Sequence, residues 1–190
     1  GLVRSIGLSN FNISQVDEIL KVAKIKPSVN QIESNPFIPQ QELIGHCKKN
    51  GIEVTAYSPL GSGDRPWVAE GEPKLLEDKT LTDVAKKYKK TPAQVCIRYQ
   101  IDRNVIVIPK SVTPSRIEAN FDVLDFKIGE EDMKSLETTK FFRSCVPVME
   151  ITLEGKTIKI PRDLKHPNFP FEELLEKFKD VAAKYKDERA

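Results

Sequence analysis

The chain has 190 residues, of which 39% are hydrophobic and 31% are charged, and its formal net charge is +2 at pH 7. We expect a soluble globular protein built around one main domain. The small net charge argues against a nucleic-acid partner or an anionic membrane surface. The chain also contains no apolar run near the roughly 18 residues of a membrane span.

Strand-like runs rich in Val, Ile or Tyr alternate with amphipathic helical patterns along the chain. Ser14 is the expected N-cap of the first helix, Gly51 the expected terminator of the second, and Thr91-Pro92 an interruption between the third and fourth. Strands are expected at residues 2–8, 28–33, 53–58 and 105–109. Helices are expected at residues 15–24, 40–49, 80–88, 92–101, 114–124 and 130–136.

The last fifty residues have a different pattern. Residues 150–160 alternate between apolar and polar side chains around Glu154-Gly155, which predicts a small hairpin. Residues 166–171 form a proline-broken loop, and residues 171–186 carry an apolar stripe at helical spacing. We therefore expect a tail of hairpin, loop and helix that packs over the main body.

Strands that alternate with helices indicate βαβ units and a mainly parallel sheet, so the predicted fold class is α/β. An eight-stranded (β/α)8 barrel typically takes about 250 residues, and four strands are too few to close one. The chain is therefore either a small open α/β sheet or half of a barrel.

The three cysteines, Cys47, Cys96 and Cys145, are far apart and form no C-x-x-C pair. This pattern fits neither a disulfide framework nor a zinc site, and it is typical of a reducing compartment. With no apolar leader in view, we expect a cytoplasmic protein. The chain begins with Gly1 on a strand-like run, so either residues have been removed or it is part of a longer polypeptide.

Polar side chains collect where the predicted strands end, which is where α/β proteins place their functional residues. Ser9, Asn10 and Gln31 could fix a carboxamide, and Tyr57 offers a flat face for a ring. Such a set binds a polar ligand well but transfers protons poorly. The alternative is that each residue only satisfies the backbone of its own loop.

Residues 108–121 read I-P-K-S-V-T-P-S-R-I-E-A-N-F and add positive charge at the last strand end. Thr113-Pro114 is a favourable helix start with a capping hydroxyl, and helix N-termini attract anions. Arg116 and Asn120 share a helix face, and Lys110 precedes them. A phosphate ester suits this group. Barrel folds place phosphate sites after their last two strands, so the fourth strand here would be the eighth of a barrel. The G-x-G-x-x-G and G-x-x-x-x-G-K-[S/T] nucleotide motifs are absent.

Several of these segments, in order, resemble the aldo-keto reductases. They are V-R-S-I-G-L-S-N-F (residues 3–11), N-Q-I-E-S-N-P (30–36), T-A-Y-S-P-L-G-S-G-D-R-P-W (55–67) and the stretch 108–121, and residues 161–171 resemble the tail of many members. The resemblance implies the C-terminal half (strands 5 to 8) of a (β/α)8 TIM barrel at residues 1–139. Residues 140–190 would then form a C-terminal loop, hairpin and helix.

The resemblance also implies NADPH as cofactor and a role for each polar strand end. The nicotinamide carboxamide would be held by Ser9, Asn10 and Gln31, with Tyr57 stacked on the ring. The loop that closes over the pyrophosphate would contain Ser58, Leu60, Ser62 and Asp64. The 2′-phosphate would be bound by Lys110, Ser111, Val112, Thr113 and Arg116, and the adenine by Asn120. Trp67 would line the substrate pocket, and Cys145 would lie in the C-terminal loop that shapes specificity. The family often has glutamate at the position where this chain has Ala119, so we expect weaker binding of adenine.

By the same resemblance, the parent enzyme reduces aldehydes or ketones, small carbonyl substrates, to alcohols and is a monomer. The family's catalytic Asp, Tyr, Lys and His come from the first four βα units, so we expect no catalytic residue in this chain and no significant reductase activity from it alone. An alternative is a non-catalytic nucleotide-binding or regulatory half-barrel that self-associates through its open strand edges. An open α/β domain without a cofactor is a third reading.

Overall fold

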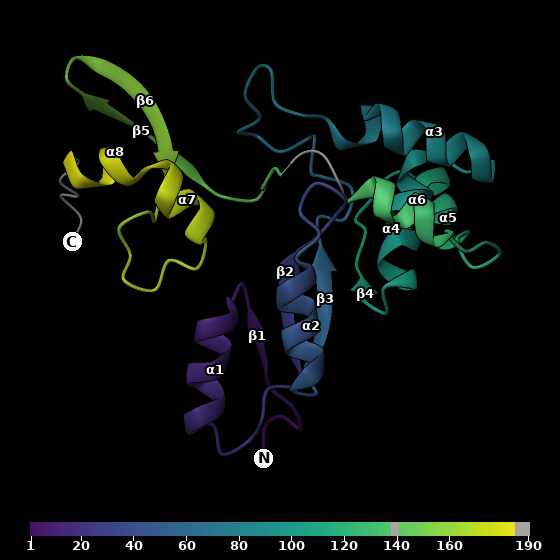
Figure 1. Cartoon of the computed structure of the whole chain (residues 1–190), viewed down its shortest axis with the longest axis horizontal. Helices are drawn as coiled ribbons and strands as arrows, with labels where there is room; N and C mark the ends of the chain where they lie inside the picture. The colour runs from purple at the N-terminus through teal and green to yellow at the C-terminus, as the bar shows by residue number, and fades with distance from the viewer. Residues whose placement is uncertain (138–140, 185–190) are drawn as a thin grey trace. The chain divides into compact units, whose positions relative to one another are not determined.

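A computed structural model of the chain describes residues 1–137 and 141–184, and it divides the chain into two compact units, Gly1–Cys145 and Val146–Ala190 (Figure 1). The boundary expected between residues 139 and 140 lies outside the described residues.

The first unit contains a four-stranded parallel sheet in the order β1-β2-β3-β4. The α/β class with a parallel sheet is therefore confirmed. The two outer strands are shorter than expected, since residues 2–6 are exposed and do not join the sheet, and β4 has only two residues. The strands are β1 (Gly7–Ser9), β2 (Val29–Glu33), β3 (Glu53–Tyr57) and β4 (Ile106–Val107).

Helices follow each strand, and all of the first unit's α-helices except α5 bury apolar residues against the sheet or against one another. The helical region expected around Thr91-Pro92 consists of two helices, α3 and α4. Thr91 is the N-cap of α4 and forms a capping box with Gln94. Gly51 has φ +64 and ends the second helix as predicted. The first unit's helices are α1 (Ile13–Val22), α2 (Gln41–Lys49), η1 (Leu75–Glu77), α3 (Lys79–Tyr88), α4 (Pro92–Asp102), α5 (Pro114–Phe121) and α6 (Glu130–Leu136).

Two helix details differ from expectation. Helix α1 is capped by Asn12, whose side chain accepts from the Gln15 backbone, while the Gln15 side chain accepts from the Asn12 backbone. Ser14, the predicted cap, lies inside the helix and donates its hydroxyl to Asn12 Oδ1 at 2.9 Å. Helix α5 begins after Thr113, but the Thr113 hydroxyl makes no capping bond, and the helix ends at Phe121 rather than residue 124.

Two apolar clusters hold the strand ends of the first unit in place. One cluster packs α1 and α2 onto the sheet and includes Val16, Ile32, Cys47 and Val54. The other joins α3, α4 and α6 around Tyr99, which is fully buried. Because these clusters pack helices against the sheet and against one another, the loops at the carboxyl ends of the strands start from a packed framework.

The second unit contains the predicted hairpin. Strands β5 (Val148–Leu153) and β6 (Lys156–Pro161) pair antiparallel, and the turn residues Glu154 and Gly155 both have positive φ, 52° and 76°. The helix expected at residues 171–186 is interrupted at Phe178, which gives α7 (Glu172–Lys177) and α8 (Lys179–Lys184). Ile151, Ile160, Leu164 and Phe169 form a small core of this unit.

Candidate functional site

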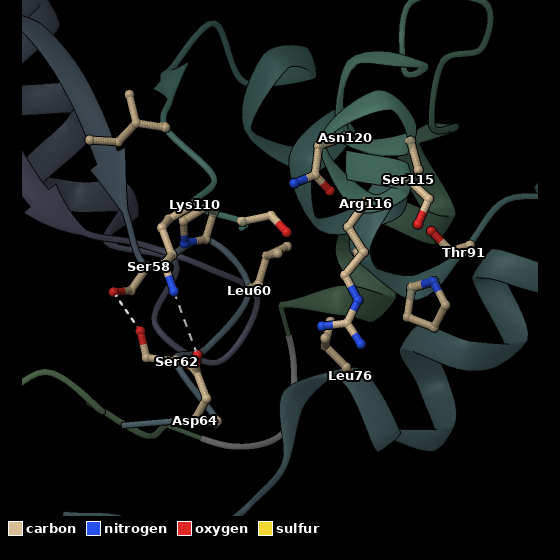
Figure 2. Close-up of a pocket in the computed structure, with 17 residues that line it drawn as sticks. Ser58, Leu60, Ser62, Asp64, Leu76, Thr91, Lys110, Ser115, Arg116 and Asn120 are labelled. Atoms are coloured by element: carbon tan, nitrogen blue, oxygen red, sulfur yellow. Dashed lines mark hydrogen bonds and ion pairs between the residues drawn. The ribbon is translucent and has the colours of Figure 1, made fainter. Parts of the chain in front are cut away.

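A pocket of about 690 Å³ lies at the carboxyl end of the first unit's sheet, between the loop after β3 and helix α5 (Figure 2). It brings together residues from two stretches that the sequence singled out separately. The predicted residues that line it are Ser58, Leu60, Ser62, Asp64, Lys110, Ser111, Arg116 and Asn120.

Two basic side chains, Lys110 and Arg116, line this pocket. Among the described residues, the Arg116 guanidinium has no hydrogen-bond or ion-pair partner, although Arg116 lines the pocket. Lys110 Nζ lies 4.0 Å from Asp64 Oδ2, and both side chains are mostly exposed, so this contact is weak. An unpaired guanidinium that lines the same pocket as an ammonium group is suited to binding a phosphate. Figure 2 shows Lys110 facing Asp64, and Arg116 extending from α5 on the other side.

Other pocket residues were not identified from the sequence. They are Pro59, Gly63, Leu76, Thr91, Pro92, Ala93, Ile108 and Ser115. Ile108 and Ser115 belong to the stretch 108–121, which was predicted to bind an anion, so the same pattern could have included them. Thr91 to Ala93 form the start of α4, which reaches the pocket only through tertiary packing, so no local pattern could have placed them there.

The loop after β3 has a fixed conformation. Ser58, Gly61 and Ser62 have positive φ, and the Ser62 hydroxyl donates to Ser58 Oγ at 2.7 Å. Arg65 pairs with Glu72, and its guanidinium lies 5.6 Å from the centre of the Phe142 ring. This loop forms one wall of the pocket.

A second polar group lies at the ends of β1, β2 and β3, outside the pocket lining. Ser9 and Gln31 are register partners across the first two strands, and the Asn10 backbone N–H donates to Gln31 O at 2.9 Å. The Tyr57 hydroxyl donates to Asn10 Oδ1 at 3.0 Å. The structure thus brings together the four residues expected to hold a nicotinamide.

Tyr57 stays protonated at neutral pH. Burial raises the pKa of its phenol well above the ordinary value of 10, and the nearby Glu33 and Cys145 raise it further. Such a phenol is a weak proton donor at pH 7 but an effective hydrogen-bond donor to Asn10.

The remaining predicted residues lie elsewhere in the first unit. Val112 and Thr113 sit between β4 and α5 without lining the pocket, and the Thr113 N–H donates to Ser111 Oγ at 3.2 Å. Trp67 Nε1 donates to Ser144 O at 3.1 Å, and Cys145 Sγ lies 3.0 Å from Ser58 Oγ. The short segment of residues 144–145 therefore contacts both Trp67 and Ser58.

Glu33 is a functional candidate that the sequence did not single out. It is fully buried at the end of β2 and accepts hydrogen bonds from Ser144 and Cys145. A carboxylate as the last residue of a buried strand was the one available signal.

Two classes of site find no support in the part of the chain that is described. No group of three or more His, Cys, Asp or Glu side chains is placed to hold a metal ion there. No described helix has the length and apolar character that crossing a membrane requires.

Comparison with protein families matches residues 1–140 to the aldo/keto reductase family. Aldo-keto reductase family 1 member A1-A of Danio rerio is 54% identical over 172 residues, which are 90% of this chain and 52% of that protein. Aldo-keto reductase family 1 member A1 of Homo sapiens is 51% identical over the same shares of the two chains. The chain thus spans about half the length of these relatives.

A solved structure is also similar. The aldo-keto reductase enzyme from a Medee basin deep-sea metagenome library is 42% identical, with a TM-score of 0.64 over 72% of this chain and 51% of that one. The parallel sheet with its helices agrees with this neighbour. The family match covers most of the chain, and the relatives are about half identical to it. The chain belongs to the aldo/keto reductase family.

Proposed function

We propose that this chain is the NADPH-binding half, strands 5 to 8, of a (β/α)8 reductase that converts aldehydes or ketones to alcohols. The observation that carries the proposal is the pocket in which Arg116, with no partner among the described residues, lies with Lys110. A free guanidinium and an ammonium group together favour a dianionic phosphate such as the 2′-phosphate of NADPH. NADH has no group to fill this position.

The other predicted residues support the same assignment. Asn120 and the small Ala119 line the pocket beside Arg116, where an adenine would lie. The loop Ser58–Asp64 forms the facing wall, suited to cover a pyrophosphate. We place the nicotinamide at Ser9, Asn10 and Gln31, with its ring on Tyr57, since these residues meet at one end of the sheet.

NADPH supplies the hydride, and the residues of this chain bind and orient it. Lys110 and Arg116 fix the adenosine end, while Asn10 and Gln31 offer the amide groups that a carboxamide needs. The raised pKa of Tyr57 makes it unsuited to protonate a carbonyl oxygen at pH 7. We infer that the proton donor lies outside this chain, and that Trp67 and Cys145 contribute to the substrate side.

Three free thiols, two of them buried, suit a reducing compartment, and we place the protein in the cytoplasm.

Cofactor selectivity tests the proposal. We expect the chain to bind NADPH more tightly than NADH, and Arg116→Ala to weaken NADPH binding by about 2 kcal/mol, or roughly thirtyfold, with little effect on NADH. Fluorescence titration measures both dissociation constants. Arg4→Ala, at an exposed arginine that does not line the pocket, is the control. Equal weakening of both cofactors by Arg116→Ala would contradict the phosphate assignment.

A second candidate is a nucleotide-binding module without turnover, because the residues gathered here bind rather than transfer protons. Both candidates predict negligible NADPH-dependent carbonyl reduction by the 190-residue chain alone, and robust turnover would refute both. A longer polypeptide that contains this chain separates them. Reduction that depends on Arg116 supports the reductase, while cofactor binding without turnover supports the module.

A further inference from the structure

Glu33 makes contacts that the proposed cofactor site does not require. Its side chain is fully buried at the carboxyl end of β2. Oε1 accepts from the Ser144 backbone N–H at 2.8 Å and from the Ser144 hydroxyl at 2.5 Å, and Oε2 accepts from the Cys145 N–H at 3.1 Å. All three donors come from one two-residue segment that is distant in the sequence.

Three hydrogen bonds hold this carboxylate. Within the described residues Glu33 forms no ion pair with a basic side chain. A buried carboxylate without a cation depends on N–H and O–H donors, and charge-assisted hydrogen bonds are stronger than neutral ones. Release of residues 144–145 would leave the buried carboxylate without these donors, which is energetically costly. The hydrogen bonds therefore hold this segment at the end of β2.

The same segment holds the loop after β3. Cys145 Sγ lies 3.0 Å from Ser58 Oγ and 3.6 Å from Ser62 Oγ, at the start of that loop. Ser144 O accepts from Trp67 Nε1 at 3.1 Å, further along it. Two points of the loop of residues 58–67 are thus attached to the segment that Glu33 holds.

We propose that Glu33 is a positioning residue that clamps residues 144–145 and, through them, the loop of residues 58–67, and so controls how long a dinucleotide stays in the pocket. Only the last step rests on the proposed function. Glu33 lies outside the pocket lining, so it acts through Ser58 and Ser62, which do line it.

Glu33→Gln tests the clamp with little change of shape. The glutamine oxygen can still accept from Ser144, but its NH2 group would face the Cys145 N–H, donor against donor. Ser144→Ala is a second variant, which removes the hydroxyl and keeps both backbone bonds. Glu53→Gln, an exposed position at the start of the neighbouring strand β3, is the matched control.

The first measurement is the native reaction rate of each cysteine with an aromatic disulfide reagent, resolved by mass spectrometry. We expect Glu33→Gln to speed the reaction of Cys145 about tenfold, while the buried Cys47 and Cys96 react at the wild-type rate. Ser144→Ala should give a smaller increase, and Glu53→Gln none. The emission of Trp67, the only tryptophan, should shift to longer wavelength in Glu33→Gln.

Two results would overturn the clamp. One is a wild-type Cys145 rate together with unchanged Trp67 emission in Glu33→Gln. The other is an equal acceleration at all three cysteines, since Glu33 would then hold the whole fold rather than this segment.

The second measurement is the NADPH dissociation rate by stopped flow. We expect Glu33→Gln to release NADPH several times faster than wild type and to keep its preference for NADPH over NADH. An unchanged release rate beside a faster Cys145 would refute the link to the cofactor. If the wild-type chain bound no NADPH, the proposed function would fail, while the cysteine rates would still decide the clamp.

Discussion

At the scale of single residues, the environment of Tyr57 shows how the fold changes a side chain's chemistry. The phenol donates to Asn10, and its pKa is raised by burial first and then by Glu33 and Cys145. Burial disfavours the charged phenolate, and two neighbouring acidic groups disfavour it further. Tyr57 is thereby a neutral ring with a fixed hydroxyl, which suits stacking and orientation.

Spectrophotometric titration can check this state. We expect the difference between wild type and Tyr57→Phe to show no phenolate absorbance as the pH passes the ordinary value of 10. The signal should appear only at higher pH or on unfolding in urea, where burial is lost. A tyrosine that ionises near pH 10 in the folded chain would mean that Tyr57 is exposed to water.

The sequence identified the pocket residues of the stretch 108–121 better than it identified their neighbours. Lys110, Ser111, Arg116 and Asn120 lie in one stretch around a helix start, so local pattern was enough. Thr91 and Leu76 reach the same pocket from α4 and η1, and only tertiary packing puts them there. Glu33 accepts hydrogen bonds from Ser144 and Cys145 because this segment returns to β2, which no local signal indicates.

At the scale of elements, the helices were easier to predict than the ends of the outer strands. Apolar spacing predicted α1 to α4 because the face that carries the apolar residues is buried. The length of a strand depends on the neighbour with which it pairs. Strand β1 begins at Gly7, which pairs with Val29, so residues 2–6 stay outside the sheet. Strand β4 pairs with β3 through two residues only. The Ser14 cap was wrong because Asn12 and Gln15 complete a reciprocal capping box three residues apart.

Stability measurements distinguish the two candidate caps of α1. Asn12→Ala removes the acceptor for the Gln15 N–H and should lower the free energy of unfolding by about 1 kcal/mol. Ser14→Ala loses only an exposed bond to Asn12 and should cost about 0.5 kcal/mol or less. Urea unfolding followed by circular dichroism measures both. A larger effect at Ser14 would contradict the cap seen in the structure.

At the scale of the whole molecule, the first unit has two open sheet edges. Among the described strands, β1 and β4 each have one neighbour, and large apolar side chains near both are exposed. Phe121 is 79% exposed on α5, a helix without a buried residue, and Leu2 is fully exposed. Open parallel edges with apolar surroundings favour pairing with another sheet.

We therefore expect the 190-residue chain to self-associate with increasing concentration in sedimentation experiments. Ile106→Lys on β4 and Phe121→Lys on α5 should shift it towards monomer, because a charge at an edge opposes pairing. Val68→Lys, at an exposed apolar residue in the loop after β3, is the control. A chain that is monomeric at all concentrations would show that these edges do not mediate self-association.

The central claim is that the pocket between α5 and the loop after β3 recognises a 2′-phosphate. The most direct measurement is calorimetric titration of the wild-type chain with adenosine 2′,5′-bisphosphate and with adenosine 5′-monophosphate, which differ in that phosphate alone. We predict that the bisphosphate binds at least about tenfold more tightly, and that Arg116→Ala removes the difference. Equal affinities for the two nucleotides in the wild-type chain would contradict the claim.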